Sequence, residues 1–133
     1  MGKILVPVDF SKVSQAVIDQ AVKEARCSGD ELVVMHVAEL NEARPESESE
    51  YKQLESLTDS YEQEGVKIEL HVAHGRPAVQ ILAAIDAVQP ERVVIGSRGH
   101  GALREVVVDS VTEEVLRRAT CPALVIPAKK AKA

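Results

Sequence analysis

KILVPV, at Lys3–Val8, is the stretch of this sequence that decides the fold. Beyond Lys3 the run is entirely apolar and rich in β-branched residues, and it is too short to form a helix of ordinary length. A strand with apolar side chains on both faces is typical of a parallel sheet that helices cover on both sides. The stretch therefore predicts a buried strand of an α/β protein.

Four more segments read as strands, and helical patterns separate them. The predicted strands are Glu31–Ala38, Val66–Val72, Arg92–Ile95 and Ala123–Ile126. Polar and apolar residues alternate most clearly in Val66–Val72, which indicates a strand near an edge of the sheet. Regular alternation of strands and helices predicts a five-stranded, mostly parallel, doubly wound sheet with helices on both faces and right-handed crossovers, a Rossmann-like α/β fold.

The ends of the predicted helices carry recognisable signals. Asp9 and Ser11 supply side-chain oxygens suited to capping a first helix, which ends at Ser28-Gly29. Residues 39–50 are acidic and polar, and we expect a mobile loop there, leading into a helix that ends near Glu64. Pro77 opens a third helix, and a fourth starts near Ser110 in a capping-box pattern, Ser110-Val-Thr-Glu113.

Apolar spacing predicts which side of each helix faces the core. In the second helix the inward residues are Leu54, Leu57 and Tyr61. In the third they are Val79, Leu82, Ile85 and Val88, and in the fourth Val111, Val115 and Leu116.

Composition limits the classes of function. The 133 residues predict one domain, 1–133, with residues 128–133 as a short basic tail. A net charge of −5 and only three aromatic residues argue against a nucleic-acid partner, which needs basic and stacking surfaces. The sequence shows neither a membrane-spanning stretch nor a signal peptide, and its two cysteines form no spacing motif. We therefore expect a cytoplasmic protein that contacts no membrane.

In doubly wound sheets, ligands bind beyond the carboxyl ends of the strands, near the switch in strand order. This rule places three loops on one rim of the sheet. They carry Asp9, Val37–Ala38 and the residues from Gly96 onward. The loop Gly96-Ser97-Arg98-Gly99-His100-Gly101 can turn its backbone N–H groups into a cradle for anions, and the start of the last helix adds further donors. Simple loop geometry explains the same glycines, so taken alone they do not settle a site.

The whole chain, from Lys3 to Ile126, resembles the universal stress protein family. The similarity includes Pro7-Val8-Asp9-Phe10-Ser11, Met35-His36-Val37, His74-Gly75-Arg76-Pro77, Val93-Val94-Ile95-Gly96 and the closing stretch Ala119–Pro127. Each piece is short, but their order and spacing together are specific.

The resemblance implies an adenine-nucleotide site. The family's signature has a glycine, two residues, a second glycine, nine residues, then a third glycine followed by Ser or Thr, and this chain matches it at Gly96, Gly99 and Ser110. By resemblance these residues would hold phosphates with help from Arg98, while Asp9 and the Val37 backbone would hold adenine. The chain departs from the signature at Asp109, which replaces the third glycine.

Asp109 changes the expected ligand. A carboxylate about 4 Å from a phosphate costs on the order of 4 kcal/mol at an effective dielectric constant of ~20. Arg98 or Mg²⁺ arriving with the nucleotide can offset part of this cost. The alternative is that Asp109 and Ser110 only start the last helix. ATP or AMP is therefore the expected cofactor, bound weakly or conditionally. A smaller adenine ligand such as AMP or adenosine is an alternative, because Asp9 and Val37 are intact. The rival hypothesis is a nucleotide-free dimeric scaffold.

The sequence predicts no catalytic residues and no resident metal. Its four histidines lack zinc-site spacing, and no nucleophile and base pattern stands out. Any ATP hydrolysis would be slow or would depend on a partner, and a slow nucleotide hydrolase is the third hypothesis. The resemblance implies a homodimer through the strand Ala123–Ile126, and a regulatory, stress-associated role that acts through a signalling partner which the sequence does not identify.

Overall fold

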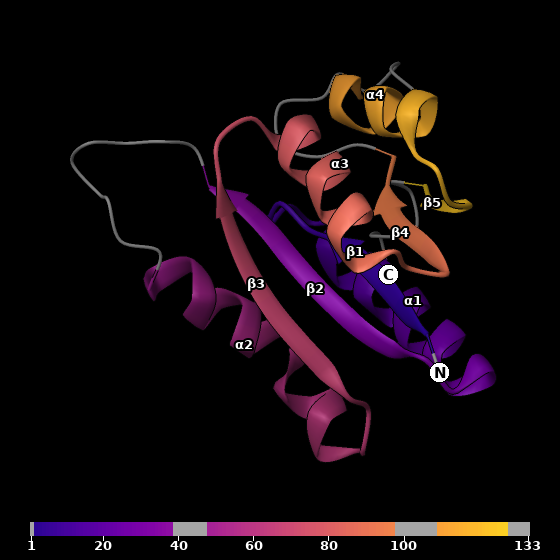
Figure 1. The fold of residues 1–133 in the computed structure, drawn as a ribbon. Coiled ribbons are helices and arrows are strands. Elements are labelled where there is room, and N and C mark those ends of the chain that lie inside the picture. The colour runs from indigo at the N-terminus through magenta and orange to yellow at the C-terminus, as the bar shows by residue number, and fades with distance from the viewer. Residues whose placement is uncertain (1, 39–47, 98–108, 128–133) are drawn as a thin grey trace.

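Strands and helices alternate along the part of the chain that the structure describes (Figure 1). The chain is seen in a computed structural model that describes residues 2–38, 48–97 and 109–127. Its elements are β1 (Lys3–Pro7), α1 (Ser14–Ser28), β2 (Glu31–Ala38), α2 (Glu48–Gln63), β3 (Ile68–His74), α3 (Pro77–Val88), β4 (Arg92–Gly96), α4 (Ser110–Arg118) and β5 (Ala123–Ile126).

The five strands form one sheet in the order β3-β2-β1-β4-β5, and all four pairings are parallel. After β1, the chain adds β2 and β3 on one side and then crosses to add β4 and β5 on the other. The switch in strand order therefore falls between β1 and β4. The predicted doubly wound sheet is confirmed, as is the edge position of the third strand, although that strand begins two residues later than predicted.

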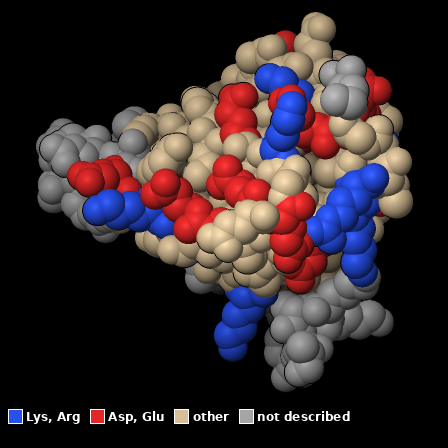
Figure 2. Space-filling model, turned by 90° about the horizontal axis from the view of Figure 1, so that it is seen from below, with Lys and Arg blue, Asp and Glu red and all other residues tan. Residues whose placement is uncertain are grey.

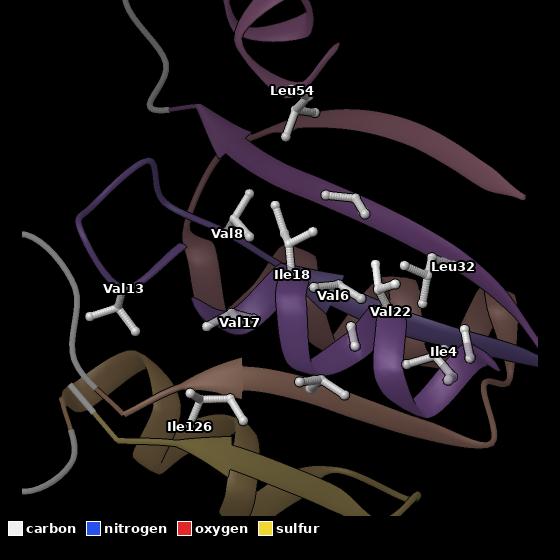
Figure 3. Close-up of a cluster of buried hydrophobic side chains, with 14 residues drawn as sticks. Ile4, Val6, Val8, Val13, Val17, Ile18, Val22, Leu32, Leu54 and Ile126 are labelled. Carbon is white, nitrogen blue, oxygen red and sulfur yellow. The ribbon is translucent and has the colours of Figure 1, made fainter. Parts of the chain in front are cut away.

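Two aliphatic clusters cover the two faces of the sheet. On one face Ile4 and Val6 of β1 pack with side chains of α1 and with Leu54 of α2 (Figure 3). On the other face Leu5 packs in a cluster with side chains of α3 and α4. Ile4, Leu5 and Val6 are each 0% exposed. Successive residues of β1 thus face opposite helical layers, as the apolar run predicts.

The buried faces of α3 and α4 match the prediction only in part, since Ile85 and Val115 are buried as predicted. In α3 the buried residues are Ala78, Ile81 and Ile85, whereas Val79 is 46% exposed. In α4, Leu116 is 41% exposed, although the spacing predicts it inside. Because α3 is apolar almost throughout, neighbouring stripes of its surface satisfy helical spacing equally well, and packing against the sheet selects one of them.

The start of α2 also corrects the prediction. Glu48 is already helical, so the expected loop over residues 39–50 is wrong in its last three residues. The rest of that loop, 39–47, and the tail, 128–133, lie outside the described residues.

The surface of the protein carries charges of both signs. The face in Figure 2 shows acidic and basic side chains interspersed rather than gathered by sign. Within the described ranges, no helix combines the length and the apolar character that crossing a bilayer requires.

The buried face of α3 can be tested with two substitutions on that helix. Ile81→Ala removes a side chain that is 4% exposed, and we expect it to lower the free energy of unfolding by about 2–5 kcal/mol. Val79→Ala is the matched control and should change it by about 0.5 kcal/mol or less. Urea unfolding followed by circular dichroism measures both, and equal losses would contradict the assignment.

Candidate functional site

The loop after β1 forms one wall of the candidate site. Asp9 Oδ1 accepts hydrogen bonds from the Ser11 backbone N–H at 3.0 Å and from the Ser14 hydroxyl at 3.4 Å. Phe10 has a positive φ of 64°, which the tight loop imposes. The predicted capping of α1 by Asp9 or Ser11 is wrong, because the N-cap is Val13 and no side chain caps it. The Asp9 carboxylate organises the loop instead.

The end of β2 braces this loop. The Val8 N–H donates to the Met35 carbonyl at 2.8 Å, and His36 Nδ1 lies 2.9 Å from the Val8 carbonyl oxygen. Since a carbonyl oxygen can only accept, Nδ1 carries the proton in this contact. The His36 ring also packs on Phe10, with ring centroids 4.1 Å apart. Thus β2 holds the polypeptide around Asp9 in place.

The opposite wall is formed where β4 ends and α4 begins. The Asp109 N–H donates to the Ser97 carbonyl at 2.7 Å, and Asp109 Oδ1 accepts from the Thr112 N–H at 2.8 Å. The Thr112 hydroxyl donates to the Gly96 carbonyl at 2.7 Å. Asp109 is therefore the N-cap of α4, and the predicted capping role of Ser110 is wrong. Ser110 is the first residue of the helix.

A cavity of about 370 Å³ lies between these two walls. Its volume is within the range of sites that hold small molecules. The ends of β1, β2 and β4 meet there, as the rule for doubly wound sheets predicts. Most of the lining is aliphatic. The polar or glycine positions that line it are Asp9, Ser11, Ser14, His36, Gly96, Asp109 and Thr112.

The predicted site residues divide into three groups. Asp9, Val37 and Gly96, from three different strand ends, all line the cavity. Ser110 is exposed and is not part of the lining, while Arg98 and Gly99 lie outside the described residues. That any of them contacts a ligand stays a prediction.

Four polar residues of the lining were not singled out as binding residues from the sequence. They are Ser11, Ser14, His36 and Thr112. The Ser11 hydroxyl oxygen is buried and has no hydrogen-bond partner among the described residues. Ser11 follows the end of β1, His36 lies near the end of β2 and Thr112 follows Asp109 by three positions, so proximity to the predicted rim was the available signal.

The ionisable side chains of the described lining are mostly carboxylates. Among the described lining residues, the ionisable ones are Asp9, His36 and Asp109, and none is Lys or Arg. In the part of the chain that the structure describes, no cluster of three or more His, Cys, Asp or Glu side chains is arranged to hold a metal ion. These residues provide hydrogen-bond acceptors at both ends of a space with aliphatic walls.

These features define a doubly wound α/β protein with a ligand-sized cavity at the switch in strand order. The model of the universal stress protein family matches residues 1–127. The chain therefore belongs to the universal stress protein family.

Similar proteins span almost the same length. The chain is 31% identical to universal stress protein YxiE of Bacillus subtilis, over 94% of this chain and 98% of YxiE. The structure of MJ0577 from Methanocaldococcus jannaschii superposes with a TM-score of 0.84 at 25% identity, covering 94% of both chains. Two further structures share the fold with TM-scores of 0.76. One is the universal stress protein of Archaeoglobus fulgidus in complex with dAMP, at 24% identity over 95% of this chain and 98% of that one. The other is a universal stress protein in complex with cAMP, at 23% identity over 94% and 95%.

The capping role of Asp109 predicts a specific pattern of stabilities. Asp109→Ala removes the acceptor of the Thr112 N–H and should lower the free energy of unfolding by about 1 kcal/mol. Asp109→Asn keeps a capping oxygen and should change it by only a few tenths of a kcal/mol. Chemical denaturation distinguishes the two, and an Asn variant as unstable as the Ala variant would contradict the cap.

Proposed function

We propose that this protein is a regulatory protein that binds an adenine nucleotide in the cavity at the ends of β1, β2 and β4. The observation that carries the proposal is that the cavity brings together Asp9, Val37 and Gly96, which come from three separate strand ends. The dAMP and cAMP complexes of proteins with the same fold support it.

The lining fits the base and sugar of such a ligand better than its phosphates. Aliphatic side chains such as Met35 and Ile95 suit the faces of a purine. The Asp9 carboxylate can accept a hydrogen bond from an exocyclic amino group, since a carboxylate has capacity for about four such bonds. The buried Ser11 hydroxyl gains a partner if a polar ligand enters. Mg²⁺ would arrive with the nucleotide.

The rival function, a nucleotide-free dimeric scaffold, is favoured by one observation. Asp109 Oδ1 already accepts the Thr112 N–H, a donor in the first turn of α4 that a phosphate would otherwise use. If this contact closes the site to every nucleotide, the cavity has no role in signalling and the dimer carries the function.

Calorimetric titration separates these functions. We expect AMP and cyclic AMP to bind, and ATP to bind more weakly, with Mg²⁺ reducing the difference. Asp9→Ala should weaken AMP binding by about tenfold or more, because a hydrogen bond to a charged group is lost. Asp59→Ala, at an exposed position of α2, is the control and should leave affinity unchanged. An absence of heat from every ligand, with the fold intact, would refute the binding proposal.

The proposal includes a homodimer that forms through β5. This strand is at the edge of the sheet, paired with β4 alone among the described strands. The Pro122 and Ile126 carbonyls accept hydrogen bonds from Val93 and Ser97 on the β4 side. Because backbone groups alternate in direction along a strand, Ala123 and Val125 direct theirs outward, where a second β5 can pair.

Sedimentation equilibrium tests the dimer. We expect a mass twice the chain mass of 14.4 kDa. Val125→Pro removes an outward N–H, and should produce monomers while β4 remains paired, whereas Val125→Ala should stay dimeric. A monomeric wild-type protein would exclude the dimer, and a dimeric proline variant would exclude this interface.

A further inference from the structure

Two carboxylates, from different walls of the cavity, line it. Asp9 follows β1 and Asp109 precedes α4, and both line the same space. The only other ionisable side chain in the described lining is His36, whose Nδ1–H is already directed at the Val8 carbonyl. The described walls therefore offer two carboxylates and no Lys or Arg to an entering ligand.

The start of α4, where an anion would normally bind, is occupied by the protein's own carboxylate. Asp109 Oδ1 accepts the Thr112 N–H at 2.8 Å, and the Thr112 hydroxyl donates to the Gly96 carbonyl at 2.7 Å. Both donors of Thr112 are thus committed within the protein. A phosphate that used either donor would have to displace a contact within the protein, and it would also approach a carboxylate.

The remaining lining suits an uncharged ligand with polar hydroxyl groups. Aliphatic residues, including Val8, Ile81 and Ile95, make up much of the wall. Within the described residues the Ser11 hydroxyl oxygen is buried without a hydrogen-bond partner. A hydroxyl group can donate and accept, so it can pair with a sugar hydroxyl without needing a charge.

We infer that the cavity selects an uncharged purine nucleoside over its phosphorylated forms, and that Asp109 determines this selectivity. The inference rests on the proposed function and refines its ligand: affinity should fall from adenosine to AMP to ATP. Asp109 has two effects on a phosphate. Its charge repels the anion, and its hydrogen bond removes a donor from the first turn of α4.

The test is calorimetry with adenosine, AMP and ATP, without divalent metal, on three forms of the full chain. For the wild-type protein we expect adenosine to bind about tenfold more tightly than ATP. Asp109→Asn removes the charge but keeps a capping oxygen, and should raise ATP affinity about tenfold while adenosine affinity changes less than twofold. Glu113→Gln removes the same charge from an exposed position on α4 and should leave all three affinities unchanged.

Salt provides a second readout. Raising ionic strength screens the repulsion between carboxylate and phosphate, so the gap between adenosine and ATP should narrow in the wild-type protein and change less in Asp109→Asn. A packing effect of the substitution would not depend on salt in this way.

Each remaining outcome overturns a defined claim. Wild-type protein that binds ATP more tightly than adenosine overturns this inference and leaves the proposed function intact. If the Asp109→Asn variant gains affinity equally for adenosine and ATP, the charge of Asp109 does not discriminate between the two ligands. That result also overturns this inference. If none of the three ligands binds any form, the proposed function fails and this inference fails with it.

Discussion

Burial of the central strands between two helical layers is the constraint on which the rest of the structure depends. Ile4, Leu5 and Val6 are excluded from solvent while pointing alternately to opposite faces of the sheet. Full burial of one such side chain stabilises the fold by roughly 1.5–3 kcal/mol. A polar side chain in the middle of β1 would lie unsolvated between two aliphatic clusters. Polar side chains that could contact a ligand are therefore expected at the ends of the central strands and not in their middle.

The same constraint explains how the candidate site is held. Its walls belong to loops, yet each wall is tied to a neighbouring strand by hydrogen bonds to the backbone. His36 of β2 contacts the Val8 carbonyl, and the N–H of Ser97 donates to the Ile126 carbonyl at the end of β5. Because the strands cannot shift without exposing their aliphatic faces, the loops between them have fixed anchor points. The described parts of the rim are thus anchored to strands whose side chains are buried some residues away.

Sequence alone was sufficient for the features that depend on pattern over several residues. Short apolar runs predicted four of the strands, polar–apolar alternation predicted β3, and Ala123–Ile126 has the predicted bounds. The rule that ligands bind beyond the carboxyl ends of parallel strands predicted that Asp9, Val37 and Gly96 lie on one rim. All three line the same cavity. The buried side of α3 was not predictable, because Val79 and Ile81 are equally apolar and only contact with the sheet distinguishes them.

The cap of α4 was ambiguous for a different reason. Asp109 and Ser110 are adjacent, and both residue types are good N-caps. What selects Asp109 is a pair of tertiary contacts: its N–H to the Ser97 carbonyl, and the Thr112 hydroxyl to the Gly96 carbonyl, sixteen positions away along the chain. These contacts set where the first turn of α4 begins, and no local pattern encodes them.

Asp109 replaces the third glycine of the family signature, and its role as the N-cap of α4 gives this replacement a second consequence. Read from the sequence, the carboxylate is an obstacle placed where a glycine would let phosphate approach. In the structure it is also a stabilising group, since it satisfies a donor that α4 would otherwise leave unpaired. Helix stability and anion exclusion therefore depend on one side chain. Restoring a glycine would remove both together, whereas an amide of the same shape separates them, because it caps the helix without carrying the charge.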